Sequence, residues 1–145
     1  MHLGPCGSGF TREGASAVLC HIQKPSTASH FVPTATVQQR LISKGDSNAC
    51  RSLAWVVMPD HLHWLIELRL ATLCTLMRRF KSRSSLELHK AGVGHHPIWQ
   101  AGYQDHALRR EENAIHIARY IVANPLRARL VNNVREYPHW DAVWL

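Results

Sequence analysis

Two histidines separated by one apolar residue form the strongest candidate for a chemical site in this sequence. His61 and His63 flank Leu62 at the start of an apolar run that continues to Leu68. In a strand, side chains alternate between faces, so both imidazoles would point to one face and the apolar residues between and after them to the other. Paired imidazoles on a rigid strand can bind a divalent metal ion. The alternative is a pair of exposed polar positions on a half-buried strand.

A second candidate group lies in the C-terminal third of the chain. Tyr120 and Asn124 are four residues apart in a segment whose apolar residues recur at helical spacing, so they share a helix face. Pro125 disfavours helical geometry at Asn124, and the helix should end or bend there. A hydroxyl and an amide oxygen would then be presented together. The alternative is that the Tyr120 ring packs in the core and Asn124 caps the helix.

Four segments, in this order and at these separations, carry a specific resemblance. They are Ala-Trp-Val-Val-Met-Pro-Asp-His-Leu-His-Trp-Leu (54–65), Ile-Trp-Gln-Ala-Gly-Tyr-Gln-Asp-His-Ala-Leu-Arg (98–109), Tyr-Ile-Val-Ala-Asn-Pro-Leu-Arg-Ala (120–128) and Tyr-Pro-His-Trp-Asp-Ala-Val-Trp (137–144). From about Leu53 to Leu145, the chain resembles the REP-associated tyrosine transposases. These belong to the single-tyrosine, IS200-like branch of the HUH family of single-strand DNA nucleases and transposases.

The resemblance implies an enzyme and a site. Tyr120 matches the nucleophile, and His61, His63 and Asn124 match the residues that hold Mg²⁺ or Mn²⁺. The implied activity is metal-dependent cleavage and strand transfer on single-stranded hairpins of repetitive extragenic palindromes, through a 5′-phosphotyrosine intermediate. Two alternatives stay open. One is a degenerate relative that binds hairpins without cutting them, and the other is an unrelated metal-binding protein built on the 11 histidines.

The charge of the chain suits a nucleic-acid partner. It has 17 Lys and Arg against 10 Asp and Glu, a formal net charge of +7, and basic proteins attract polyanions by counterion release. The candidate DNA-binding residues are Arg78, Arg79, Lys81, Arg83, Arg109, Arg110 and Arg127. A solvated helix face is the alternative for those between 78 and 83. Trp99 and Tyr103 could stack on unpaired bases, and core packing is equally plausible for Trp99.

Three further polar positions are weaker candidates. Asp105 and His106 could form a second shell around the metal, contact DNA, or tie a loop to the sheet. His116 precedes Tyr120 by one helical turn and could accept a proton, although an exposed histidine is the commoner case. Asp60 should point away from His61 in a regular strand, so we do not expect it to be a ligand.

The pattern of elements predicts an α+β fold, and the resemblance specifies a small antiparallel sheet with packed helices, of the ferredoxin-like or RRM-like type. We expect helices near 36–43 and 73–90, a short strand after Pro97, and the Tyr120 helix. Pro59 interrupts a strand run over 52–68, which should therefore form two strands or one strand with a bulge. Residues 36–145 should form a single domain after a divergent segment, 1–35, of uncertain order. Gly, Ser and Pro25 make that segment a poor strand, with 17–22 the stretch best able to form one.

Composition gives the remaining expectations. No apolar run reaches the length of a membrane span and no convincing signal peptide is present, so we expect a cytoplasmic, nucleoid-associated protein, either a monomer or a homodimer. Four cysteines without metal-binding spacing predict free thiols.

Arg129 stands where relatives often place glycine after the Tyr120 helix. If that position needs positive φ, arginine costs about 1 kcal/mol there.

Overall fold

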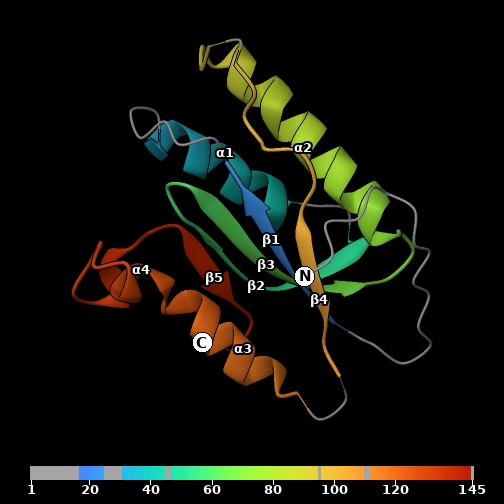
Figure 1. The fold of residues 1–145 in the computed structure, drawn as a ribbon, viewed down its shortest axis with the longest axis vertical. Helices are drawn as coiled ribbons and strands as arrows, with labels where there is room; N and C mark the ends of the chain where they lie inside the picture. Colours follow the sequence, from blue (N-terminus) through green and yellow to red (C-terminus); the bar gives the residue numbers. More distant parts are fainter. Residues whose placement is uncertain (1–16, 25–30, 45–46, 95, 110–111, 145) are drawn as a thin grey trace.

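The computed structural model describes residues 17–24, 31–44, 47–94, 96–109 and 112–144. In these ranges a sheet lies between two layers of helices, with α1 and α2 on one face and α3 and α4 on the other (Figure 1). The elements are β1 (Val18–Gln23), α1 (Phe31–Ser43), β2 (Cys50–Val57), β3 (His61–Leu68), α2 (Leu73–Lys90), β4 (Gln104–Ala107), α3 (Ala114–Val122), α4 (Asn124–Arg127), a 3-10 turn η2 (Val134–Glu136) and β5 (Trp140–Ala142).

The sheet has five strands in the order β4-β1-β3-β2-β5. Every neighbouring pair is antiparallel. The predicted α+β class with a small antiparallel sheet and packed helices is therefore confirmed.

The run that Pro59 interrupts forms a hairpin of two strands, which is the first of the two alternatives that the sequence left open. β2 ends at Val57 and β3 begins at His61, and the Met58 N–H donates to the His61 carbonyl at 2.8 Å to close the turn. A β-bulge between Ser52 and Ala54 shifts the register of β2 against β3. The hairpin fixes His61 at the first position of a central strand.

The alternation of β3 divides its side chains between two cores. Leu62, Trp64 and Ile66 pack with α1 and α2 in one cluster, and Leu65 packs with α3 in the other. Because His63 alternates with Leu62 and Trp64, the imidazoles of β3 lie on the face that α3 covers. The predicted division of the strand into an apolar face and a histidine face is thus confirmed.

β1 forms within the N-terminal segment, over nearly the stretch that the sequence singled out. It pairs with β3 on one side and β4 on the other, with His21 opposite His63 and Gln23 opposite His61. Cys20 and Ile22 are fully buried on the α1 and α2 side. The strand therefore completes the centre of the sheet, and it contains Val18 and Ile22, which are β-branched residues that favour strands.

The core between the sheet and α2 contains three aromatic rings. Phe80 lies 5.2 Å from Trp64 and 5.6 Å from Trp99, measured between ring centroids. The Trp99 indole N–H donates to the Ser84 hydroxyl at 2.8 Å, and Trp99 is 8% exposed. Core packing is therefore the role of Trp99, and Tyr103 packs half-buried against the same cluster.

The cysteines differ in part from expectation. Cys20 and Cys50 are buried and form no disulfide, as predicted, but Cys74 is disulfide-bonded, so the prediction of four free thiols is wrong. Cys6 lies outside the described residues. Spacing along the chain could not reveal this bond, because a disulfide depends on distances in the folded molecule.

None of the helices in the described ranges combines the length and the hydropathy that a membrane crossing requires.

Lys24, directly after β1, is a buried lysine, and its burial should make the stability of the protein depend on pH. It is 6% exposed, and its Nζ donates to the Met58 carbonyl at 2.9 Å. Burial lowers the pKa of Lys24 to about 7, partly offset by Asp60. Because the unfolded chain retains a lysine pKa near about 10.4, it binds more protons than the folded protein between these values, and stability rises with pH there.

We expect the substitution Lys24→Met to remove this pH dependence. The free energy of unfolding of the unsubstituted protein, relative to that of Lys24→Met, should increase by up to about 1.4 kcal/mol per pH unit above pH 7. Urea unfolding of both proteins from pH 6 to pH 9 measures the difference. Parallel curves would show that Lys24 keeps its ordinary pKa in the fold.

The end of α4 explains the cost predicted at Arg129. Arg129 has φ +55°, its N–H donates to Leu126 and the Leu130 N–H donates to Pro125, both at 3.0 Å. This is the pattern of a Schellman cap, which places a residue in the left-handed region and favours glycine there. The requirement for positive φ is confirmed.

Arg129→Gly should therefore stabilise the protein by about 1 kcal/mol. The gain comes from removing a Cβ that crowds the backbone in the left-handed region, while the cap's hydrogen bonds stay. Urea unfolding gives the difference, and Arg129→Ala is the matched control, because it removes the guanidinium and keeps the Cβ. An equal gain in both variants would attribute the effect to the charge and not to the backbone.

Candidate active site

Three imidazoles, not two, meet on the face of the sheet that α3 covers. The ring of His21, from β1, lies 4.9 Å from that of His61 and 4.6 Å from that of His63, and the His61 and His63 rings are 4.8 Å apart. We call this group the histidine cluster. His21 joins it because β1 pairs in register with β3, which puts His21 opposite His63. All three side chains are partly exposed, so a ligand can reach them.

Asp60 fixes the orientation of His61. Its Oδ1 lies 2.7 Å from His61 Nδ1, although the two residues are adjacent in sequence. The strand begins only at His61, so Asp60 is free to turn back toward the ring. A carboxylate that accepts from Nδ1–H leaves Nε2 with a lone pair for a metal or a proton. Asp60 thus contacts the candidate site as a partner of His61.

His63 is the most enclosed member of the histidine cluster. Burial lowers the pKa of His63 to about 3, with further contributions from His61, His21 and Arg127. Burial and the neighbouring His61 also lower the pKa of His21. Both rings are therefore neutral at neutral pH, which is the form that binds metals. The His63 Nδ1 atom is buried without a hydrogen-bond partner among the described residues.

α3 presents Tyr120 to solvent while its opposite side is buried. Asn113 caps the helix, with its Oδ1 accepting from the Ile115 N–H at 2.9 Å. Ala118, Ile121 and Val122 pack in the same cluster as Leu65 of β3. Tyr120 is 59% exposed, which excludes packing of its ring in the core. The hydroxyl is accessible to a substrate.

Asn124 and Arg127 hold the end of this helix together. The Asn124 Nδ2 donates to the Ile121 carbonyl at 2.9 Å, and its Oδ1 accepts from Arg127 at 2.9 Å. Arg127 also donates to the Tyr120 carbonyl at 2.9 Å, and its guanidinium stacks 3.6 Å from the centre of the Tyr120 ring. Asn124 therefore caps the helix end, and Arg127 fixes the position of the tyrosine ring.

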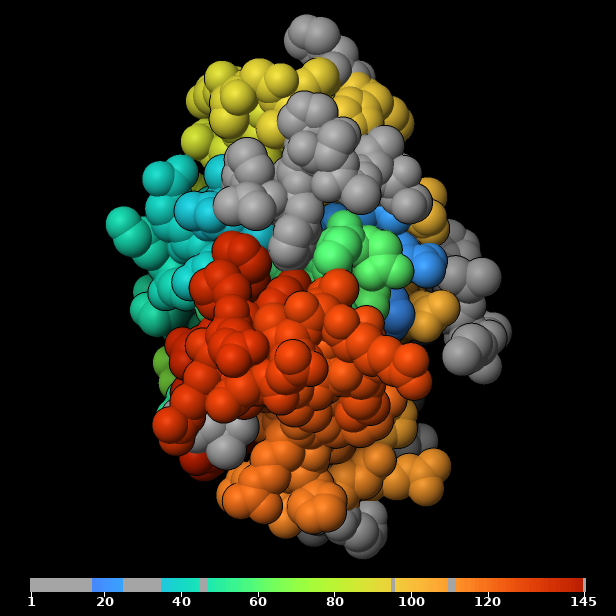
Figure 2. All heavy atoms as spheres, turned by 90° about the vertical axis from the view of Figure 1, so that its left-hand side faces the viewer, coloured from blue at the N-terminus to red at the C-terminus, as the bar shows by residue number. Residues whose placement is uncertain are grey.

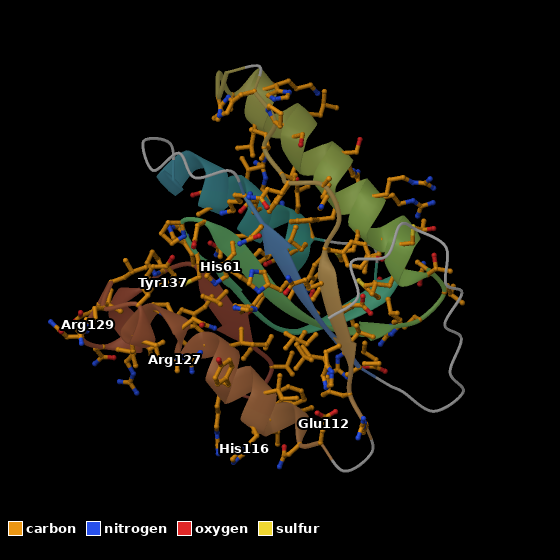
Figure 3. The ribbon with its side chains drawn as sticks, in the orientation of Figure 1. His61, Glu112, His116, Arg127, Arg129 and Tyr137 are labelled. Carbon is orange, nitrogen blue, oxygen red and sulfur yellow. The ribbon has the colours of Figure 1, made fainter. Side chains whose placement is uncertain are left out.

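Arg127 also connects the helix to the histidine cluster. Its charge contributes to the lowered pKa of His63, so the guanidinium lies within electrostatic reach of that ring. Figure 3 shows Arg127 and His61 on the same side of the molecule, with His116 and Glu112 toward the start of α3. In Figure 2 the green atoms near residue 60 and the blue atoms of β1 reach the surface beside the orange and red C-terminal segment. The histidine cluster and α3, which carries Tyr120 and which we call the tyrosine helix, thus border one region of the surface.

The basic residues of α2 lie across the sheet from the histidine cluster. Arg78, Arg79 and Arg83 are exposed, but α2 covers the face of the sheet opposite the histidine cluster. Lys81 donates to the Gln100 carbonyl at 2.9 Å and also to the Gly102 carbonyl, and burial lowers its pKa. It ties α2 to the loop before β4. Arg109 is exposed, and Arg110 lies outside the described residues.

The weaker candidates occupy the β4 edge and the start of α3. Asp105 pairs with Cys20 and so belongs to the face opposite the histidine cluster. The His106 Nε2–H donates to Glu112 Oε1 at 2.9 Å, and the other carboxylate oxygen of Glu112 accepts from the Arg109 N–H at 2.6 Å. His106 therefore ties β4 to the segment before α3, which is the loop-tying alternative. His116 is exposed in the first turn of α3.

A family model described as "Transposase IS200 like" matches residues 25–124. The chain belongs to the IS200-like transposase family. The match includes His61, His63, Tyr120 and Asn124, and it leaves out β1 and therefore His21. The resemblance that the four sequence segments carried is confirmed.

Individual relatives support the same family. The chain is 30% identical over 87 residues to a REP-associated tyrosine transposase from Escherichia coli (strain K12), covering 59% of this chain and 50% of that protein. This IS200-like chain thus spans about half the length of that curated relative.

Two solved structures share the fold. One is a REP-associated tyrosine transposase bound to a REP hairpin, with TM-score 0.72 and 21% identity, covering 92% of this chain and 82% of that one. The other is a candidate transposase from Deinococcus radiodurans R1, with TM-score 0.54 and 17% identity, covering 81% and 95%.

Sequence reasoning missed His21 and the Asp60 contact. β1 gave a weak signal, and nothing in the sequence states the register between strands so far apart in the chain. Regular strand alternation predicts that the Asp60 side chain points away from His61, but β3 begins only at His61, so the alternation does not extend to Asp60.

Among the described residues, no three His, Cys, Asp or Glu side chains are already arranged to hold a metal ion. Metal binding would require a rearrangement of side chains in the histidine cluster.

Proposed function

We propose that the protein is a metal-dependent single-strand DNA endonuclease and strand transferase that acts on palindromic hairpins. The observation that carries this proposal is the exposed Tyr120 on a helix that covers the same sheet face as His61 and His63. A buried tyrosine or histidines on the other face would be incompatible with it. Family membership supports the transposase chemistry, and the solved relative bound to a REP hairpin supports the substrate class.

In this proposal Tyr120 is the nucleophile. Its Oη attacks the phosphorus of a DNA phosphodiester and forms a tyrosine–5′-phosphate bond, while the bond to the 3′ oxygen breaks. The phenolic proton is lost, and the departing strand gains one to become a 3′-hydroxyl. The reverse reaction, with a second 3′-hydroxyl, joins a new strand and frees Tyr120. Arg127 would hold the ring in position for both steps.

His61, His63 and Asn124 would hold Mg²⁺ or Mn²⁺ in this proposal. The buried His63 Nδ1, which has no hydrogen-bond partner within the described part of the chain, fits such a group, and so does His61, whose contact with Asp60 uses Nδ1 and not Nε2. When bound, the ion would withdraw charge from the scissile phosphate. Asn124 would contribute its Oδ1, which has a second lone pair beyond the one that Arg127 uses.

The basic residues would contact the DNA backbone in this proposal. Arg109 and Arg127 lie near the tyrosine helix and could contact the cleaved strand. Arg78, Arg79 and Arg83 could contact the same DNA only if it extends around the sheet to the α2 side. Their contribution would appear as salt-dependent binding rather than as a change in the chemistry.

A covalent-trapping experiment tests the function. The purified chain is incubated with a labelled single-stranded palindromic hairpin and Mn²⁺ or Mg²⁺, and the products are separated on a denaturing gel. We expect label at the mass of protein plus DNA, and its loss when EDTA removes the metal. Salt-sensitive hairpin binding without the adduct would instead identify a binding-only relative. Metal retention without DNA binding would favour an unrelated metal-binding protein.

A further inference from the structure

We propose that His21 is a third imidazole ligand of this metal site, and that the site therefore selects a first-row transition-metal ion over Mg²⁺. The inference rests on the proposed function for the location of the ion, and it adds a ligand and a preference among metals. His21 lies outside the residues that the family model matches. It belongs to β1, which precedes the residues that the family model matches.

The spacing of the three rings is the first support. An imidazole nitrogen about 2.1 Å from a metal ion places its ring centre about 3.2 Å from that ion, and two such rings at about 90–100° are about 5 Å apart. The three observed separations are 4.6, 4.8 and 4.9 Å. The backbones of β1 and β3 thus already hold the rings at the separation that a shared ion requires. The side chains must still move to share an ion, because the described His, Cys, Asp and Glu side chains form no group already arranged to hold one.

The state of the nitrogens is the second support. Asp60 engages His61 through Nδ1, which leaves Nε2 of that ring available. The His63 Nδ1 atom is buried without a partner among the described residues, and such an atom often marks a missing ion or water. The nearby charges oppose one another, because Asp60 attracts a cation and Arg127 repels it.

The donor type sets the preference among metals. Mg²⁺ binds oxygen ligands and keeps most of its water, whereas imidazole suits zinc, iron and nickel. A site with two histidines and an amide oxygen can still accept Mg²⁺ through its waters. A third imidazole in the same place favours ions such as Co²⁺ or Zn²⁺, which bind nitrogen well.

Zinc binding without DNA tests the inference. The EDTA-stripped full chain is titrated with Zn²⁺ by calorimetry and compared with His21→Gln and with His89→Gln, a control on α2 across the sheet. The ring resonances of the histidines are followed by NMR in the same titration. We expect His21→Gln to weaken Zn²⁺ binding about 10–100-fold and His89→Gln to leave it unchanged. In the unsubstituted protein, the resonances of His21, His61 and His63 should shift together, and excess Mg²⁺ should not displace Zn²⁺.

The inference would be overturned if His21→Gln bound Zn²⁺ as tightly as the unsubstituted protein and if Zn²⁺ left the His21 resonance of the unsubstituted protein unshifted. Should that variant fail to fold, the resonances of the unsubstituted protein decide the question alone. Zinc bound through His21 in a protein that forms no DNA adduct would refute the proposed function and leave this inference standing. Adduct formation together with unchanged Zn²⁺ affinity in His21→Gln would do the reverse.

Discussion

Replacing Tyr120 by phenylalanine should abolish the covalent adduct with hairpin DNA, a loss of more than about 1,000-fold, while hairpin binding stays within a few-fold. The substitution removes only the nucleophilic oxygen. The ring is 59% exposed and stacks on Arg127, and a phenylalanine ring can keep that position. Fold stability should therefore change little. A denaturing gel measures the adduct, and a fluorescence titration measures binding.

Tyr137→Phe is the matched control for this prediction. The Tyr137 hydroxyl donates to the Val57 carbonyl at 2.6 Å in the core, so its removal should cost about 1 kcal/mol of stability and leave adduct formation intact. Adduct that persists in Tyr120→Phe would refute the assignment of the nucleophile. Loss of adduct in both variants would point to a general effect on the fold.

Replacing His63 by alanine should remove both activity and the response to divalent metal. A metal ion present at about 100 times its Kd stabilises a folded protein by about 2.7 kcal/mol, and this gain should disappear in the variant. Adduct formation should fall by more than about 100-fold. Thermal unfolding with and without Mn²⁺ gives the first quantity and the gel gives the second. We expect the same pattern for His61→Ala.

His89→Ala is the control for the histidine variants. His89 lies in the last turn of α2, on the other side of the sheet, so its removal should preserve both the metal-dependent stabilisation and the adduct. If His63→Ala still cuts DNA in Mg²⁺ at the unsubstituted rate, the metal site lies elsewhere. If it loses the adduct but keeps the stabilisation, His63 contributes to the reaction without being a ligand.

Local periodicity was enough to predict much of this molecule. The alternation of β3 placed His61 and His63 on one face and Leu62 and Trp64 on the other, as the two core clusters confirm. Helical spacing predicted the buried stripe of α2, and Pro59 marked the interruption that lies between β2 and β3. These features depend on residues close in sequence, so the sequence specifies them directly.

Features that depend on distant pairing could not be predicted in this way. The register between β1 and β3 brings His21 to His63, and no local pattern encodes it. The position of α2 across the sheet from the tyrosine helix likewise follows from how the layers assemble, so charge clustering alone could not separate its arginines from Arg127. Asp60 turned toward His61 because the turn before β3 breaks the regular alternation.

The central place of β1 also has a kinetic consequence. His61 and His63 belong to the β2–β3 hairpin, whose strands are adjacent in sequence and can pair early, whereas β1 must close a long loop before it reaches β3. Two of the three rings in the histidine cluster would thus be in place before the third arrives. We expect the last ring to be added in a late folding step, so an ion that binds all three would slow unfolding by holding β1 in the sheet.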